Sequence, residues 1–440
     1  MAIIENIIQE HSDEISALFN GNFKHQNEIL IELIDQQDRI EAHLDGLLLD
    51  PVLGWENAQE ALRFGDVGEL YVASLVAIAS KNQDYLKEVG KIAIDSPEMA
   101  PGFLHALLWY PIQTIQPIIN SLIKTKSPVA QSLGVAALSS HGVDPGPAFE
   151  PLLTSDEKIV IQRAAQAAGE VGRVDLLSSL NRLLDHENPE VRFTVAKAAT
   201  MLGSQTAAKA LIDLVKQEEY RHEAMRYVIP LMSTNNAQFW LNELAKDLAY
   251  TRSVIYGTGV LGDPQNIPGL IRAMHHKEYA RIAGNAFSLM TGVDVDEMNL
   301  TPDSSEETQP ANAEPTEAAT EDYDNDDPDR DEIFPWPDPE KITAWWQSNH
   351  TRFIVGQRYL MGLPTDDKNL ITVLYEGNQQ QRNAAALQLK LRRPEQPLFN
   401  TRVRVSTQIA ILNALSAELQ AKPHSPDYMP NGDLVNVESE

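Results

Sequence analysis

Two His-Glu dipeptides are the residues of this sequence whose types best suit chemistry. They are His186-Glu187 and His222-Glu223, thirty-six residues apart. Imidazole and carboxylate groups both bind iron and related transition metals. His186-Glu187, however, stands directly before Asn188-Pro189, where a loop is expected to lead into a helix. We therefore interpret these four residues as exposed polar groups and predict no metal site and no cofactor.

Other catalytic signatures are missing from the sequence. The chain has no cysteine, which excludes a disulfide framework, a thiolate metal site and a cysteine nucleophile. Neither a G-x-S-x-G elbow nor a phosphate-binding G-x-x-x-x-G-K-[ST] loop occurs. His105 lies near Trp109 and Tyr110 and is interpreted as a buried, hydrogen-bonded histidine. The sequence thus predicts no catalytic residue and a protein that is not an enzyme.

Three tryptophans form the densest aromatic cluster and are the best candidates for partner contacts: Trp336, Trp345 and Trp346. On a helix, adjacent side chains point about 100° apart, so Trp345 and Trp346 are not expected to face the same core. We expect one to be buried and the other to line a groove or a domain contact. Tryptophan is a common anchor of protein interfaces, and packing in the core is the alternative interpretation.

Charge is the second pointer to a partner. The formal net charge is −28, with a net of −11 in residues 1–126 and −15 in residues 294–332. The acidic segment includes Asp324, Asp326 and Asp327, which we take as candidates for attracting a basic partner, a solvated spacer being the simpler interpretation. Direct binding of nucleic acid is not expected, because phosphate recognition needs clustered Lys and Arg.

The elements that carry these residues follow a repeat of about thirty residues. Five Ala-rich apolar segments each end in a glycine, at Gly142, Gly172, Gly203, Gly262 and Gly292, with spacings of 30, 31, 59 and 30. Glycine suits the end of a helix because it adopts positive φ at little cost. Second amphipathic helices follow most of these glycines, at 174–186, 205–217 and 265–276. One such helical hairpin cannot bury its own apolar face, so the hairpins must stack.

This pattern resembles HEAT-type repeats. The segments D-E-K-I-V-I-Q-R and D-H-E-N-P-E-V-R place Asp156 seven residues before Arg163 and Asp185 seven before Arg192. The resemblance implies bonds between neighbouring repeats at these residues. Asp247 stands only five residues before Arg252, so the third clear repeat departs from the spacing.

The predicted fold is all-α, a HEAT-like α-solenoid of antiparallel helix pairs. We divide the chain into an N-terminal helical region that caps the array (1–126), the repeat array (127–293), an acidic disordered linker (294–333), a C-terminal helical region (334–421) and a flexible tail (422–440). The N-terminus lacks the features of a secretory signal, and no apolar run reaches 18 residues. The expected location is the cytoplasm, without membrane contact.

Two further blocks carry a more specific resemblance. Residues 33–62 contain R-I-E-A-H-L-D-G-L followed by G-W, and residues 334–364 combine P-W-P-D-P with W-W and G-Q-R-Y-L-M-G-L-P, with R-R-P-E-Q-P-L-F-N-T-R at 392–402. Together these resemble a family of proteobacterial HEAT-like proteins of uncharacterised biochemistry, often found in type VI secretion gene neighbourhoods.

The resemblance implies a protein that binds a secreted effector, in one of two roles. The first is an immunity protein that neutralises a basic toxic effector, the second an adaptor that loads the effector for export. A separate alternative, independent of that resemblance, is a metal-dependent HEAT-repeat enzyme, a hydroxylase or a lyase-like protein. The hydroxylase class uses four His-Glu dipeptides from successive repeats, whereas this chain has two.

Overall fold

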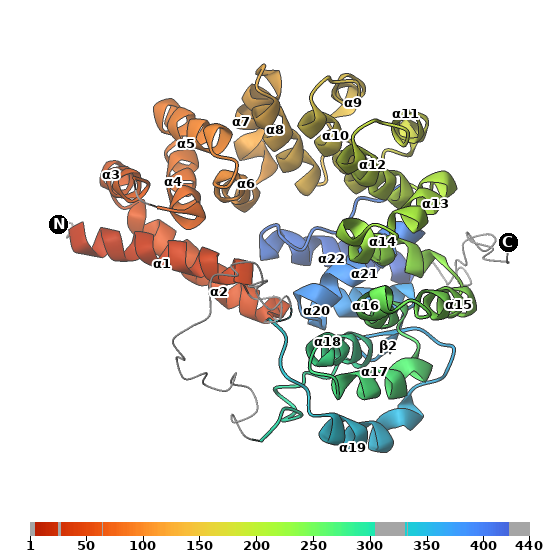
Figure 1. Cartoon of the computed structure of the whole chain (residues 1–440). Helices are drawn as coiled ribbons and strands as arrows, with labels where there is room; N and C mark the ends of the chain where they lie inside the picture. The colour runs from red at the N-terminus through yellow and green to blue at the C-terminus, as the bar shows by residue number, and fades with distance from the viewer. Residues whose placement is uncertain (1–4, 25–27, 64, 304–330, 332, 422–440) are drawn as a thin grey trace, which may run out of the picture. The chain divides into compact units, whose positions relative to one another are not determined.

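The computed structural model describes residues 5–24, 28–63, 65–303, 331 and 333–421. Over these residues the chain is an all-α solenoid of antiparallel helix pairs, as the repeat pattern predicts (Figure 1). The described strands are β1 (Tyr359–Leu360) and β2 (Leu363–Pro364), which pair antiparallel with Tyr359 opposite Pro364. No helix in this part of the chain combines the length and the apolarity that a bilayer crossing needs.

The chain divides into two compact units. Unit 1 consists of Met1–Leu214 and Leu370–Met429, and unit 2 of Val215–Asn369 and Pro430–Glu440. The helices of unit 1 are α1 (Glu5–Lys24), α2 (Leu30–Leu47), α3 (Pro51–Ala61), α4 (Val67–Ser80), α5 (Gln83–Asp95), α6 (Ala100–Trp109), α7 (Ile112–Lys124), α8 (Pro128–Ser140), α9 (Phe149–Leu153), α10 (Lys158–Val171), α11 (Leu177–Leu183), α12 (Pro189–Met201), α13 (Gln205–Leu214), α21 (Gln379–Arg392) and α22 (Val405–Ala421).

Unit 2 contains fewer helices and both strands. Its helices are α14 (Glu218–Val228), α15 (Thr234–Leu244), α16 (Thr251–Leu261), α17 (Ile267–Met274), α18 (Ala280–Thr291) and α19 (Pro339–Asn349), and α20 (Asp367–Glu376) crosses the boundary between the units. Short 3-10 turns join some helices: η1 (Gly146–Ala148), η2 (Val174–Leu176), η3 (Ile229–Leu231), η4 (Leu248–Tyr250), η5 (Pro264–Asn266) and η6 (His350–Arg352).

The repeat helices begin and end where local chemistry dictates. At the start of α12 the Asn188 side chain accepts a hydrogen bond from the Val191 N–H, and Pro189 occupies the first turn, where it loses no helical bond. At the other end, all five predicted glycines lie within two residues of a helix end and have φ between 69° and 90°. This confirms the predicted helix stops.

Small side chains bring the inner helices of unit 1 close together. Helix α10 buries Ala164, Ala165, Ala167 and Ala168, and α12 buries Ala196, Ala198 and Ala199. At their contact, a Cβ on Gly169 would lie 2.9 Å from Ala198 Cα, which leaves no room for a side chain. These helices pack in one apolar cluster with the outer helices α9 and α11. The Ala-rich pattern of the sequence therefore encodes a close helix spacing.

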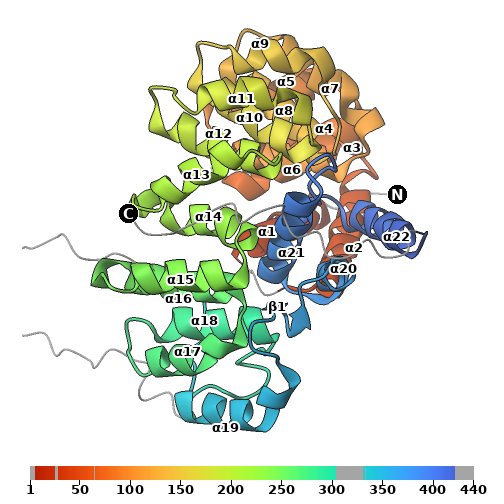
Figure 2. The same cartoon turned by 90° about the vertical axis from the view of Figure 1, so that its right-hand side faces the viewer.

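A segment from the C-terminal part of the chain runs across the helix ends of unit 1. We call residues 393–404, between α21 and α22, the return segment. The Leu398 N–H donates to the carbonyl of Glu170 at 2.7 Å, and the Asn400 side chain donates to the carbonyl of Ser140 at 3.1 Å. Helix α22 then packs against α2 (Figures 1 and 2). The C-terminal helices and the N-terminal array thus form one compact unit.

The same arrangement occurs separately within unit 2. There β1 and the turn after it cross the ends of α16 and α18. The Tyr359 N–H donates to the carbonyl of Gly262 at 2.9 Å, and the Met361 N–H donates to the carbonyl of Leu289 at 2.8 Å. In both units a later part of the chain supplies donors to carbonyls at helix ends, groups that a helix leaves without internal partners.

We expect the five repeat glycines to differ in how well they tolerate alanine. A Cβ on Gly172 would overlap the carbonyl oxygen of Glu395 in the return segment, whereas a Cβ on Gly142 would meet only Pro397 Cβ at 3.9 Å. Both positions have positive φ, which costs a residue with a Cβ about 1–2 kcal/mol. Gly142→Ala should show that cost alone, and Gly172→Ala should lower the unfolding free energy by roughly 1–3 kcal/mol more. Urea unfolding measures both, and equal losses would contradict a tight contact at Gly172.

Candidate partner-binding surface

Helix α19 carries two of the three candidate tryptophans. Its start is the one that the sequence predicts: Asp338 caps the Lys341 N–H at 2.9 Å, and Pro339 takes the first helical position. The Trp345 ring meets Phe287 of α18 edge-on, with 5.5 Å between ring centroids. The Trp346 ring lies 5.4 Å from that of Phe353. Both tryptophans are half-buried against the same apolar cluster.

The expectation that Trp345 and Trp346 could not share a core is wrong. The two side chains do leave the helix in different directions, but the chain after α19 turns back through η6. Phe353 is thereby placed against Trp346 while α18 covers Trp345. One apolar cluster thus surrounds two sides of α19. Each tryptophan keeps an exposed part, which leaves partner contact at these residues a proposal.

Trp336 packs differently, against a cation. The guanidinium carbon of Arg281 lies 4.5 Å from the centre of the Trp336 ring, a distance suited to a cation–π contact. The next residue, Pro337, covers Gly284 of α18, where a Cβ would lie 3.1 Å from the proline ring. Trp336 is half-buried by this arrangement. Arg281 covers one face of the Trp336 indole, so a partner protein would contact only the part of the ring that stays exposed.

The acidic segment is only partly described. Asp324, Asp326 and Asp327 lie outside the described residues, so their role stays a prediction. Residues 294–303, which the sequence assigned to the linker, are folded: Val295 and Leu300 are buried, and the Asp338 N–H donates to the carbonyl of Leu300 at 2.7 Å. Beyond the segment, Asp331 is buried and paired with Arg252. Its flanks on both sides are therefore fixed to unit 2.

The His-Glu dipeptides have structural partners. His186 Nδ1 accepts a hydrogen bond from the Asn188 N–H at 3.0 Å. His222 Nε2 lies 3.0 Å from the Ser253 hydroxyl, and its ring stacks on that of Tyr256 at 4.7 Å. Glu187 is exposed as expected, whereas the other three residues are half-buried, because neighbouring helices cover them. Within the described residues, no group of three or more His, Asp or Glu is placed to hold a metal ion.

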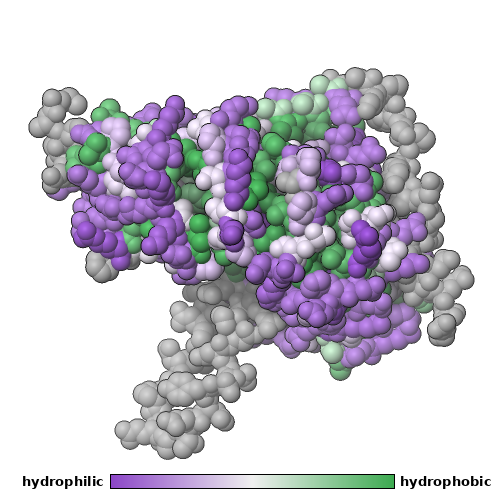
Figure 3. All heavy atoms as spheres, turned by 90° about the horizontal axis from the view of Figure 1, so that it is seen from above, coloured by the Kyte–Doolittle hydropathy of each residue, from purple (hydrophilic) through white to green (hydrophobic). Residues whose placement is uncertain are grey.

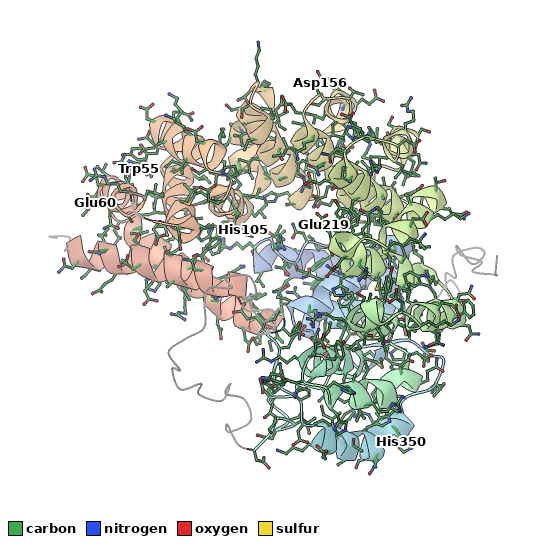
Figure 4. The ribbon with its side chains drawn as sticks, viewed as in Figure 1. Trp55, Glu60, His105, Asp156, Glu219 and His350 are labelled. Atoms are coloured by element: carbon green, nitrogen blue, oxygen red, sulfur yellow. The ribbon has the colours of Figure 1, made fainter. Side chains whose placement is uncertain are left out.

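The remaining residues singled out in the sequence are structural. His105 lies on α6 (Figure 4), and its Nδ1 is 2.9 Å from the carbonyl of Pro101. Burial lowers the pKa of His105, and the bond to Pro101 opposes that shift. This is the hydrogen-bonded packing histidine that the sequence predicts, although it is half-buried rather than fully buried.

Of the two arginines of the repeat motif, Arg163 makes the expected bond between neighbouring repeats, and Arg192 bonds the turn before its own helix. Arg163 bonds Ser139 of the preceding repeat and Glu170 of its own helix. Arg192 donates to the carbonyl of His186 at 2.7 Å and to that of Glu187 at 2.9 Å. Asp156 is exposed in the turn before α10 (Figure 4), and Asp185 is exposed as well. The Asp-to-Arg spacing therefore marks a repeat boundary without forming an ion pair there.

Sequence reasoning missed an exposed apolar turn in unit 2. Ile354 and Val355 are 69 % and 66 % exposed, directly after the buried Phe353. The turn is fixed by its backbone: the Gly356 N–H donates to Asp263 Oδ1 at 3.0 Å, and the Ile354 N–H donates to the Tyr359 hydroxyl at 3.0 Å. In the sequence, the run F-I-V is typical of a buried strand. Only the tertiary bonds to Asp263 and Tyr359 turn it outward.

It also missed a buried lysine in α21. Lys390 is 2 % exposed, and its ammonium donates to the carbonyls of Pro394 and Gln396 at 2.8 and 2.6 Å. Burial lowers the pKa of Lys390 to about 8, with Glu170 acting against the shift. In the sequence this lysine lies among Gln and Arg residues, a composition typical of the solvent-exposed face of a helix. The lysine holds the first turn of the return segment onto α21.

The surface around these sites is of mixed polarity. In Figure 3 hydrophilic residues predominate on the face shown, and apolar residues lie between them. Six large apolar side chains among the described residues exceed 55 % exposure: Leu248, Leu49, Ile354, Val355, Ile31 and Val52. Scattered apolar residues are normal on a protein surface, whereas neighbouring ones indicate an interface.

Residues 146–228 match the family model described as HEAT repeats. This part of the chain is similar to HEAT repeats. The match covers helix pairs from η1 to α14, where the glycine stops and Ala-rich inner helices are most regular. No curated protein and no solved structure matches the chain significantly. HEAT-like arrays present extended surfaces that suit protein binding, and they are in general scaffolds rather than catalysts.

We predict that the tryptophans differ in their contribution to stability. Trp345→Ala removes a ring packed edge-on against the buried Phe287 and should lower the unfolding free energy by about 2–3 kcal/mol. Trp336→Ala removes mainly a contact with Arg281 and should cost about 1 kcal/mol. Chemical unfolding of the two variants tests the order, and a larger loss for Trp336→Ala would contradict this assignment.

Lys390 should make stability depend on pH. Its folded pKa of about 8 lies below the ordinary 10.5, so between these values the unfolded chain binds more protons. Stability must then rise with pH across this window, by up to about 3 kcal/mol for this one group. The unfolding free energy of wild type should therefore increase relative to that of Lys390→Met as the pH rises from 8 to 10.5. Lys91→Met, at an exposed lysine of the same unit, should show no such change, and parallel curves for wild type and Lys390→Met would refute the shift.

Proposed function

We propose that this chain is a cytoplasmic protein-binding HEAT-repeat protein that captures a basic secreted effector. The observation that carries the proposal is the combination of stacked HEAT repeats with a formal net charge of −28. Stacked repeats offer a long surface to a folded partner. The negative charge attracts a basic protein and opposes nucleic acids and anionic membranes.

Within this proposal, neutralisation of a toxic effector is the preferred role. The resemblance to HEAT-like proteins of type VI secretion neighbourhoods supports a secretion context, and a basic toxin such as a nuclease complements an acidic inhibitor. Binding of this kind needs no catalytic residue, since covering the toxin is sufficient. The alternative role is an adaptor that carries the effector to the secretion machinery. An adaptor must release the effector for export, whereas an immunity protein protects the cell better when the effector dissociates slowly.

Co-expression distinguishes the two roles. If the chain is an immunity protein, cells that produce a basic toxic effector bound by the chain should survive when the chain is present. Deleting the gene should instead abolish export of the effector, without self-poisoning, if it is an adaptor. Survival that requires no complex between the two proteins would contradict both roles.

The association with that effector should depend strongly on salt. Long-range attraction between opposite charges raises association rates and is screened beyond about 8 Å at physiological ionic strength. The association rate constant should fall by about tenfold or more between low and high salt, while the dissociation rate changes much less. Surface plasmon resonance over a salt series provides the measurement. An effector with an acidic binding face, or an association rate indifferent to salt, would show that the charge serves solubility alone.

A further inference from the structure

Helix α2 has one buried and one uncovered face. Its inner face buries a set of apolar residues against α1, α3 and α4: Leu30, Leu33, Ile40, Leu44 and Leu47. The outer side is exposed and includes one row of residues that runs along the helix. We call this row the α2 stripe and define it as Ile31, Asp35, Asp38, Ala42 and Asp45 on the helix, with Leu49 in the turn that follows.

The helical part of the α2 stripe is continuous. Its five members follow one another at steps of four, three, four and three residues, and Leu49 stands four residues further along the chain, in the turn after the helix. Such steps keep side chains on one face of a helix and match the period with which two helices pack side by side. At 1.5 Å per residue the helical part, from Ile31 to Asp45, extends about 21 Å. That length corresponds to about four helical turns, enough to seat another helix.

Both ends of the stripe are apolar and exposed to solvent. Ile31 is 63 % exposed at one end and Leu49 is 73 % exposed at the other. Val52, in the first turn of α3, adds a side chain that is 58 % exposed next to Leu49 in the chain. Three of the six most exposed large apolar side chains of the described residues thus flank this face of α2, two of them within three residues of each other. Neighbouring exposed apolar groups such as Leu49 and Val52 indicate an interface rather than chance exposure.

The middle of the stripe is acidic. Asp35, Asp38 and Asp45 are exposed, and their carboxylates make no hydrogen bond or ion pair within the described residues. The charged neighbours beside the stripe are already paired: Arg39 with Glu14 at 3.3 Å, and Glu41 with Arg404. No cation of unit 1 therefore neutralises the three aspartates. Their negative field is directed at whatever approaches this face.

We propose that the α2 stripe docks a basic amphipathic helix of the protein partner. Lysine or arginine side chains of that helix pair with Asp35, Asp38 and Asp45, and apolar side chains near its two ends contact Ile31 and Leu49. This interface rests on the proposed function, to which it adds the position of the interface and the chemistry of the partner. Charge complementarity is the reason for choosing a basic partner.

Charge also argues against the other possible occupants. The acidic segment of this chain has a net charge of −15 in residues 294–332, and residues 422–440 have a net charge of −3. Either segment would be repelled by the three aspartates. A second copy of the chain presenting the same stripe would place aspartates opposite aspartates, which is unfavourable as well. An external basic helix meets no such repulsion.

The test uses the full chain and a synthetic peptide. The probe is a 21-residue amphipathic helical peptide with leucines near both ends and lysines between them, and its counterpart has glutamate at each lysine position. Isothermal titration should show binding of the lysine peptide and none of the glutamate peptide. Asp35→Lys/Asp38→Lys/Asp45→Lys should weaken binding at least about tenfold. Ile31→Ser/Leu49→Ser should also weaken binding, and this loss of affinity should change less with salt concentration than the loss caused by the lysine substitutions.

A matched variant separates a local interface from general attraction by an acidic protein. Asp95, Asp156 and Asp185 are exposed aspartates of the same unit, away from the α2 stripe in the sequence. Asp95→Lys/Asp156→Lys/Asp185→Lys changes the net charge by the same amount as the stripe variant. This control should retain affinity within about threefold. Equal losses in the two triple variants, or no binding of the lysine peptide, would overturn the proposed interface. Should the lysine triple fail to fold, the triple Asp→Asn variant at the stripe takes its place.

Toxin rescue distinguishes failure of this interface from failure of the proposed function. Loss of rescue by the stripe triple, with rescue by the control triple, supports both proposals. Rescue by both triples overturns the stripe as the interface and leaves the proposed function standing. Absence of rescue by wild type, together with stripe-dependent binding of the lysine peptide, overturns the immunity role alone.

Discussion

The carbonyl groups at the ends of the repeat helices are the constraint on which the rest of this structure depends. A helix leaves its last carbonyls without internal partners, and in a stacked array many such ends come close together. Here backbone N–H groups from distant parts of the same chain approach them: Leu398 bonds Glu170 in unit 1, and Tyr359 bonds Gly262 in unit 2. The approach is possible because glycine stands at the crossing points, where a Cβ would overlap the arriving backbone.

Burying the return segment brings cations into the interior of unit 1. Lys390 is fixed by two carbonyls of the loop that follows α21, and Arg382 donates to the carbonyl of Leu374 at 2.8 Å and to Gln408. Burial lowers the pKa of Lys390 to about 8 and that of Arg382 to about 10, so both cations are held at a cost. The Lys390 ammonium satisfies carbonyls of the irregular return segment, whereas Arg382 bonds the last turn of α20 and a side chain of α22. The two buried cations thus tie a loop and neighbouring helices of this unit together.

The surfaces left over by this packing differ in what they offer a partner. The tryptophans of unit 2 are already engaged by Phe287, Phe353 and Arg281, so any partner would find them preorganised but partly covered. The outer face of α2 in unit 1 is free, with its carboxylates unpaired among the described residues. A rigid helix that presents both charge and apolar groups loses little conformational entropy on binding. This difference favours α2 over α19 as the main contact.

Local chemistry was sufficient to predict the helical repeats, their glycine stops and the proline at the start of α19. Each depends on neighbouring residues: periodic apolar positions make the helices, and glycine adopts the positive φ that ends them. The destination of residues 393–404, the outward turn at Ile354 and Val355 and the burial of Lys390 depend on contacts with residues far away in the chain. From the sequence alone, Lys390 and Asp35 are both predicted to be charged, solvent-exposed residues on amphipathic helices. Only the tertiary structure buries the first beneath a loop and leaves the second exposed, because burial is decided by what packs against a helix face.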